Sequence, residues 1–323
     1  MFMKKFVLAA LACVTLTANA AVIKIAALAP EGTNWAKTMK DFSKEVKKAT
    51  DGKVKVKIYY GGVAGDEPDV LRKIRVGQLH GGVFTGKTLG DIAGDIRAIE
   101  LPFNFLHDEK KAMKALKGMT PYFNKKIEAS GFVNLGFYGI GQVYVVSTKK
   151  VSSIPQMQGV KIWSWEGDRV VEAMISSLKL VSVPLALPDV LSSLSTNIID
   201  AAYAPPLGIL ALQWQSQIKY LINFPTAYSI GALLISKKGW KKIPAKHHAK
   251  VKEIAKKYVD QANEYSVKDN AQGLETLKSL GVEFIDFDDK DIAKAEEIRA
   301  KVLDKLKGKV ISEKAIKMLE SYR

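Results

Sequence analysis

The sequence predicts an α/β fold, a mostly parallel sheet with helices on its faces. The prediction depends above all on residues 159–206, which read as strand, helix, strand, helix, strand. Short apolar runs rich in β-branched side chains alternate there with helical spacing, clearest over residues 168–178. Alternation of this kind is typical of α/β proteins. Ligands bind such sheets at the carboxyl ends of strands, which here are residues 163–167 and 203–206.

Three residues in this stretch mark helix ends. Asp168 precedes the first helix and is predicted to be its N-cap. Pro188 suits the first turn of the second helix, where a missing N–H costs nothing. Asn197 tolerates the left-handed conformation that ends a helix, so the strand over residues 198–202 should begin just after it.

The first third of the chain predicts the same alternation. Residues 22–28 form an apolar strand, and a helix with its apolar residues at helical spacing follows it. Residues 53–60 alternate lysine with apolar side chains, which predicts a strand with one solvated face. A glycine-rich turn then leads into a helix over 67–76 and a strand over 81–85.

The remaining elements complete the predicted fold. They are, in order, a helix over 110–130 interrupted near Pro121, strands over 133–138, 143–147 and 231–236, a long helix from Pro244 to about Leu280, a strand over 282–287 and an amphipathic helical tail from Asp291.

The N-terminus predicts export. Residues 1–20 combine Lys4 and Lys5, an apolar core and a small-residue cleavage site, as a secretory signal peptide does. The apolar core is too short to span a membrane stably, so we expect a soluble mature protein starting at Ala21. The only cysteine, Cys13, lies inside this signal and lacks a good lipobox, so lipidation is the less favoured alternative.

The net charge of +16 raises the question of an anionic partner. An excess of basic residues can indicate binding to nucleic acids or to anionic membrane surfaces. Here the lysines are spread along helices among acidic residues, and no aromatic and basic recognition motif accompanies them. We therefore interpret the charge as a solvated surface and predict no nucleic-acid partner.

The motifs along the chain resemble the substrate-binding proteins of tripartite ATP-independent periplasmic (TRAP) transporters, of the DctP type. Each motif is short, but their order covers nearly the whole mature chain. They are GVAG at 62–65, RVGQL at 75–79, LPF at 101–103, GVKIW at 159–163, VPL at 183–185 and LSTNIIDAAYAP at 194–205.

The resemblance implies a two-lobed periplasmic binding protein, or Venus-flytrap fold, with mixed sheets flanked by helices and a long helix spanning both lobes. It implies that lobe I comprises residues 21–143 and 231–272, and that lobe II comprises residues 144–230 and 273–323. It also implies a periplasmic location, a small-molecule ligand and the subunits of a TRAP-type membrane permease as partners.

Catalytic chemistry finds little support in the sequence. The four histidines lie outside metal motifs, and the adjacent His247 and His248 would point in different directions on a helix. No Gly-x-Ser-x-Gly nucleophile elbow is present. Glu166 is simply a loop charge beside the N-cap Asp168. We expect a protein that is not an enzyme and that uses no cofactor and no metal.

Two departures from the family pattern decide the expected ligand. The family's arginine, which pairs with a ligand carboxylate, falls at Trp163, and its asparagine falls at Ala204. Indole offers one N–H donor and an apolar face, and it cannot replace the two parallel hydrogen bonds of a guanidinium. These departures argue against a simple carboxylate ligand.

The expected ligand site is therefore aromatic. Our candidate ligand-binding residues are Trp163, Ala204, Tyr203, Trp35, Tyr144, Gln142, Trp165, Phe103 and Thr85. Gln142 lies about where some family members carry a second arginine. Several of these aromatic residues would serve equally well as ordinary core. Arg169 is the nearest replacement cation, but its place in the helix aims it away.

The function expected from the sequence is ligand capture by hinge closure and delivery to a TRAP-type permease. An apolar, aromatic or amphipathic ligand fits the two departures, and such TRAP systems also allow a periplasmic tetratricopeptide-repeat partner. The alternative is a sensory or interaction protein that kept the fold but lost transport.

Overall fold

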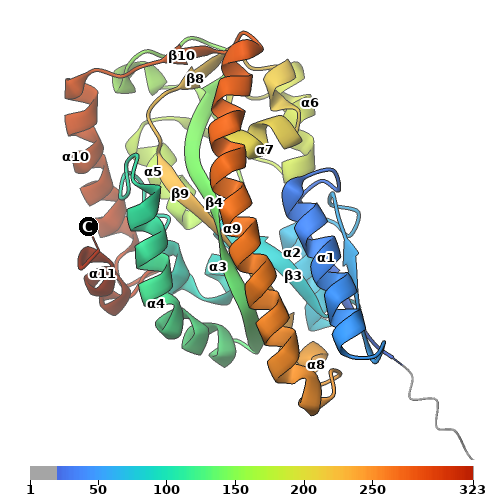
Figure 1. Cartoon of the computed structure of the whole chain (residues 1–323). Coiled ribbons are helices and arrows are strands. Elements are labelled where there is room, and N and C mark those ends of the chain that lie inside the picture. Colours follow the sequence, from blue (N-terminus) through green and yellow to red (C-terminus); the bar gives the residue numbers. More distant parts are fainter. Residues whose placement is uncertain (1–19, 323) are drawn as a thin grey trace, which may run out of the picture.

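A computed structural model describes residues 20–322, and its strands form one twisted mixed sheet with helices on both faces (Figure 1). The predicted signal peptide and Cys13 lie outside the described residues, apart from Ala20. The strands are β1 (Ala21–Ala26), β2 (Val54–Tyr59), β3 (Gly81–Thr85), β4 (Phe132–Ser147), β5 (Lys161–Ser164), β6 (Val181–Pro184), β7 (Ala201–Ala204), β8 (Tyr220–Ile222), β9 (Ala227–Ser236) and β10 (Glu283–Ile285).

The helices follow the predicted alternation. They are α1 (Asn34–Ala49), α2 (Glu67–Arg75), α3 (Gly86–Ile92), α4 (Glu109–Ala129), α5 (Arg169–Ser177), α6 (Val190–Ser195), α7 (Pro206–Ala211), α8 (Lys237–Trp240), α9 (His248–Ser279), α10 (Asp289–Leu306) and α11 (Glu313–Glu320). Short 3-10 turns include η1 (Gly94–Ala98) and η3 (Leu187–Asp189).

The sheet has two halves that meet on β4. Its strand order is β2-β1-β3-β9-β4-β7-β5-β6, and β8 joins β10 to β4. We call β1, β2, β3 and β9 the first half, and β5, β6, β7, β8 and β10 the second half. Pairing is parallel among β1, β2 and β3 and among β5, β6 and β7, while β9 and β4 are antiparallel to their neighbours. The mixed sheet expected from the resemblance is thus confirmed.

Strand β4 is one continuous element of 16 residues, so the prediction of two separate strands was wrong. It pairs with β9 up to Val143 and with β7 from Tyr144 onward. The apparent break comes from a register shift between Gly139 and Gly141, which the sequence shows only as glycines. The strand passes α9 closely there, because a Cβ on Gly141 would lie 2.4 Å from Nδ2 of Asn270.

Helix α9 runs beside β4 along the length of the molecule (Figure 1). It contacts α1 next to the first half of the sheet and α7 next to the second half, as expected for a helix that spans both. The helix starts at His248 rather than at Pro244, because residues 245–247 form a 3-10 turn. No helix among residues 20–322 is long and apolar enough to cross a membrane.

Helix α4 continues through Pro121, although the sequence predicted an interruption there. An interior proline removes one helical hydrogen bond and costs about 3 kcal/mol or more. Met119, Phe123 and Ile127 are fully buried on one face of this helix. Burial of three such side chains contributes about 1.5–3 kcal/mol each, which offsets the cost of the proline.

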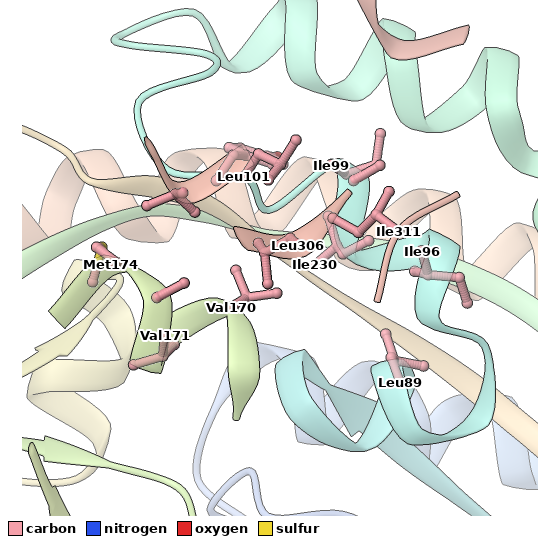
Figure 2. Close-up of a cluster of buried hydrophobic side chains, with 14 of the residues drawn as sticks. Leu89, Ile96, Ile99, Leu101, Val170, Val171, Met174, Ile230, Leu306 and Ile311 are labelled. Carbon is pink, nitrogen blue, oxygen red and sulfur yellow. The ribbon is translucent and has the colours of Figure 1, made fainter. Parts of the chain in front are cut away.

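The main hydrophobic core connects the two halves of the sheet. Figure 2 shows Val170, Val171 and Met174 of α5 beside Ile230 of β9 and Leu306 of α10. All five side chains belong to one continuous buried cluster. This shared core holds the second half of the sheet against η1 and β9.

Candidate ligand cleft

An apolar cavity lies between the two halves of the sheet and beside α9. It has a volume of about 210 Å³. The loop after β1 and strand β3 supply one wall, β4 and α9 the back, and η3 and α7 the opposite wall. Its apolar lining includes Leu28, Trp35, Val83, Ile140, Leu187 and Leu207. We call this space the apolar cavity.

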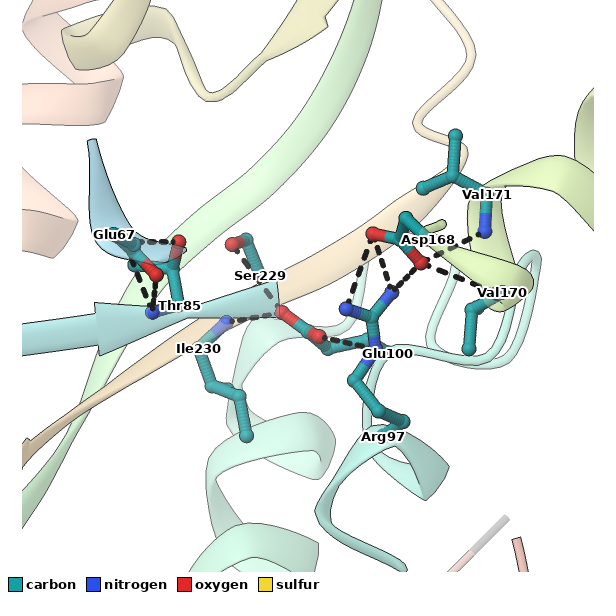
Figure 3. A network of polar contacts seen from close by, with 9 residues as sticks. All are labelled: Glu67, Thr85, Arg97, Glu100, Asp168, Val170, Val171, Ser229 and Ile230. Atoms are coloured by element: carbon teal, nitrogen blue, oxygen red, sulfur yellow. Dashed lines mark hydrogen bonds and ion pairs between the residues drawn. The ribbon is translucent and has the colours of Figure 1, made fainter. Parts of the chain in front are cut away.

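Glu67 is the buried acid of the apolar cavity. Its side chain is 3% exposed and accepts hydrogen bonds from the backbone N–H and the hydroxyl of Thr85, at 2.8 to 3.1 Å. Figure 3 shows this contact at the end of β3. Burial raises the pKa of Glu67 to about 8, because no cation compensates for the lost hydration.

Asp269 is the second acid of the apolar cavity and projects from α9. Both of its carboxylate oxygens accept from Nδ2 of Asn34, at 3.0 and 3.1 Å. Among the described residues, neither a lysine nor an arginine lines this cavity. The cavity therefore offers no cation to a carboxylate ligand.

A smaller cavity of about 80 Å³ lies next to the apolar cavity, and Thr85 lines both. Trp165 and Tyr203 form part of its wall together with Arg97. The hydroxyl of Tyr203 is buried and finds no hydrogen-bond partner among the described residues. Burial raises the pKa of Tyr203 well above its usual value, so this hydroxyl keeps its proton.

A buried ion network closes this smaller cavity (Figure 3). Nη2 of Arg97 donates to Oδ1 of Asp168 at 2.9 Å, and Nε of Arg97 lies 3.1 Å from Oε2 of Glu100 without hydrogen-bond alignment. Glu100 also accepts from the backbone N–H of Ile230 at 3.0 Å. Burial raises the pKa of Glu100, and the positive charge of Arg97 opposes that shift.

Asp168 has two roles in this network. Its Oδ1 accepts from the N–H groups of Val170 and Val171, which confirms the predicted N-cap of α5. The same carboxylate pairs with Arg97, which the sequence did not predict. Arg97 and Glu100 belong to an irregular segment around η1, which carries no motif or periodicity that could have singled them out.

A second contact joins the two halves at Asp66. Its Oδ1 accepts from the N–H of Glu67 at the start of α2. Its Oδ2 accepts from Nε1 of Trp165 at 2.9 Å and from the N–H of Leu187 at 3.4 Å. The two halves are thus held together on both sides of the cleft.

Trp163 lies behind the cleft wall and lines neither cavity. Its side chain is 2% exposed, and Nε1 donates to the carbonyl of Leu185 at 3.0 Å. It stacks on Tyr203 at 4.8 Å and meets Trp165 and Trp214 edge-on. It thus supports two wall residues, while the buried Ala204 on β7 lines neither cavity.

The other candidate residues fall into two groups. Trp35 and Thr85 line the apolar cavity, and Trp165, Tyr203 and Thr85 line the smaller one. Phe103, Gln142 and Tyr144 line neither.

The residues of the second group have other contacts. Phe103 stacks on Phe224, and Nε2 of Gln142 donates to the carbonyl of Phe105. Tyr144 is buried opposite Ala204 in the pairing of β4 with β7. Arg169 is exposed and lines neither of these two cavities, but it lines a third, polar cavity of about 520 Å³ together with Arg97 and Asp168. Within residues 20–322, no cluster of histidine, cysteine, aspartate and glutamate is suited to a metal ion.

Comparisons with known proteins agree with this architecture. A family model described as bacterial extracellular solute-binding protein, family 7 (DctP), matches residues 25–309. The C4-dicarboxylate-binding periplasmic protein DctP of Rhodobacter capsulatus is 22% identical over 295 residues, which cover 90% of this chain and 88% of that protein.

Two solved structures illustrate the shared fold. The sugar acid binding protein DctPAm of Advenella mimigardefordensis, in complex with galactonate, has a TM-score of 0.87 and 19% identity, covering 94% of this chain and 98% of the other. A TRAP periplasmic solute binding protein of Haemophilus influenzae with bound L-gulonate has a TM-score of 0.86 and 20% identity, covering 93% and 98%. At these identities the likeness shows the fold alone.

Proposed function

Because the chain belongs to the bacterial extracellular solute-binding protein family 7, the DctP family of TRAP binding proteins, we propose that it captures a small molecule by hinge closure in the periplasm and delivers it to a TRAP-type permease. Family membership makes it a binding protein rather than an enzyme. Closure around a ligand shifts the equilibrium between open and closed forms and presents the closed surface to the permease.

The ligand we propose is apolar, aromatic or amphipathic rather than a simple carboxylate. The observation that carries this proposal is the apolar cavity, which no lysine or arginine among the described residues lines. A desolvated carboxylate without a paired cation is strongly disfavoured. The structural neighbours named above hold galactonate and L-gulonate, so this chain would differ from them in ligand class.

The candidate site then divides into lining and supporting residues. Trp35 and Thr85 would touch the ligand directly. Trp165 and Tyr203 would close the polar end of the cleft, and Trp163 would hold both rings in place from behind.

We also propose that residues 21–143 and 231–272 form lobe I. The change of partner along β4, from β9 to β7 after Val143, supports a hinge at this point. A tetratricopeptide-repeat partner remains a prediction from the resemblance alone. A sensory protein on the same fold is the alternative, and the absence of permease genes beside this gene would favour it.

A titration tests the ligand class directly. We expect 2-phenylethanol to bind measurably by calorimetry and D-galacturonate to show no heat of binding. Leu187→Glu places a charge in the apolar cavity and should weaken 2-phenylethanol binding more than tenfold. Ile198→Glu is the matched control, because Ile198 is exposed and lines neither cavity. Tight binding of D-galacturonate by the native protein would overturn the proposal.

A further inference from the structure

We propose, building on the proposed function, that the ligand is an organic cation, an apolar or aromatic amine whose ammonium group pairs with the carboxylates of Glu67 and Asp269. Four features of the apolar cavity carry this inference: its unpaired acids, the burial of Glu67, its aromatic wall and its volume.

The acids of the apolar cavity lack the basic partners found elsewhere in the chain. Lysine and arginine outnumber aspartate and glutamate by 49 to 33, so cations are plentiful. Glu45 pairs with Lys257 at 2.6 Å, and Asp168 pairs with Arg97. Neither Glu67 nor Asp269 has an ion pair with a described residue. In so basic a protein, two acidic side chains in one cavity without ion pairs suggest that they bind a cationic ligand.

Glu67 has no positive partner among the described residues for its ionised form. Its surroundings are Thr85 on β3, Thr88 on α3 and the neighbouring carboxylate of Asp66, which adds negative charge. Hydroxyl and amide donors alone leave the pKa of Glu67 at about 8, so without a cation beside it this side chain is largely protonated at neutral pH. A bound ammonium would favour the ionised form and release that proton.

Asp269 supplies the second carboxylate from a half-buried position on α9. Its two hydrogen bonds both come from one nitrogen, Nδ2 of Asn34. An ionised carboxylate has about four acceptor sites, so capacity remains for a further donor. An ammonium group carries three donors and no acceptor, which suits this surplus.

The aromatic wall favours a cation as well. Trp35, Tyr138 and Tyr265 line the cavity, and the rings of Trp35 and Tyr138 meet edge-on at 5.8 Å. A cation over an aromatic face gains about 0.5–2 kcal/mol, most on tryptophan. A cavity of about 150 Å³ holds benzene. The volume of about 210 Å³ therefore fits a benzene ring with a short aminoalkyl chain.

Three probes of similar shape and different charge test the inference. They are 2-phenylethylammonium, 2-phenylethanol and 3-phenylpropionate, each titrated calorimetrically at neutral pH. We expect the cation to bind at least tenfold more tightly than the alcohol, and the acid to bind most weakly. If the alcohol binds as tightly as the cation, the charge inference fails while the apolar ligand class survives. If the acid binds best, both proposals fail.

Two variants separate the contribution of the Asp269 carboxylate to binding from the general effect of removing a negative charge from α9. Asp269→Asn should weaken binding of 2-phenylethylammonium about tenfold and leave that of 2-phenylethanol unchanged. Glu264→Gln on the same helix is the matched control, because Glu264 is exposed and lines no cavity described here. A cation affinity that is the same in Asp269→Asn and in the control would overturn the pairing with Asp269.

Proton release gives an independent measurement on Glu67. The binding heat of 2-phenylethylammonium at pH 7 is measured in two buffers of different ionisation enthalpy. The native protein should release most of one proton per cation bound. Glu67→Gln, whose amide oxygen still accepts from Thr85, should release none. Equal proton release by this variant and the native protein would contradict the role of Glu67.

Discussion

Arg97 and Asp168, 71 positions apart in the chain, form a buried ion pair across the cleft, with Nη2 and Oδ1 2.9 Å apart. Arg97 comes from η1, beside the first half of the sheet, and Asp168 caps α5 in the second half. The protein thus pairs this buried arginine with a carboxylate of its own. Since this arginine is already neutralised, it is a poor anchor for an acidic ligand.

Asp168→Asn tests this ion pair without removing the helix cap, because asparagine is an equally good N-cap. The variant leaves the guanidinium of Arg97 buried with Glu100 alone. We expect a loss of about 3–5 kcal/mol in the free energy of unfolding, measured by chemical denaturation. Glu172→Gln, an exposed change on the same helix, should cost almost nothing. Equal stability of the two variants would contradict the importance of the pair.

Glu67→Gln tests the buried acid through the pH dependence of stability. The pKa of Glu67 is about 8 in the folded protein and 4.5 as its ordinary value, so the folded state holds the extra proton. The native free energy of unfolding should therefore fall between pH 5 and pH 8 relative to that of the variant. Denaturation at both pH values measures this difference, and groups common to both proteins cancel. A parallel pH dependence in the two proteins would show that Glu67 ionises normally.

Gly141→Ala tests the close approach of β4 to α9. Gly141 has φ of +134°, and a Cβ there would lie 2.4 Å from Nδ2 of Asn270. We expect a loss of about 1–3 kcal/mol in unfolding free energy. Gly32→Ala is the control, since its Cβ would meet nothing within 4 Å and its φ is ordinary. A Gly141 variant as stable as the control would mean that strand and helix separate easily here.

Trp163→Arg tests whether restoring the family's arginine restores acid binding. Trp163 is buried among three aromatic rings, so a guanidinium there would lack a partner. We expect several kcal/mol of destabilisation and no calorimetric signal with D-galacturonate. Trp163→Phe should cost less, since it buries no charge and loses the hydrogen bond to Leu185 and part of the ring packing. A folded Trp163→Arg protein that binds D-galacturonate would place this position at the ligand.

Local sequence patterns correctly predicted the features that depend on a residue's own type and on its neighbours in the chain. The parallel pairing of β5 with β6 and β7 followed from the strand and helix alternation. Asp168 caps α5, and Asn197 adopts the left-handed conformation with φ of 58°, as their residue types indicated. Because such features are determined by residues close together in the chain, a single sequence is enough to predict them.

The features that the sequence analysis did not predict depend on residues far apart in the chain. The Arg97–Asp168 pair spans 71 positions, and no spacing rule connects its members. Pro121 sits within α4 because packing of its buried face outweighs a local penalty. Trp163 is ligand-facing by alignment, yet Tyr203 and Trp165 stand between it and the smaller cavity.

The most direct measurement is mass spectrometry of the small molecule that co-purifies with the protein from its native periplasm. The protein is denatured, and its ligand is extracted and identified against a mock purification. We predict an apolar or aromatic molecule, with a basic amine if Glu67 and Asp269 act as inferred. A short polar carboxylate, recovered in proportion to the protein, would contradict the account of the cleft.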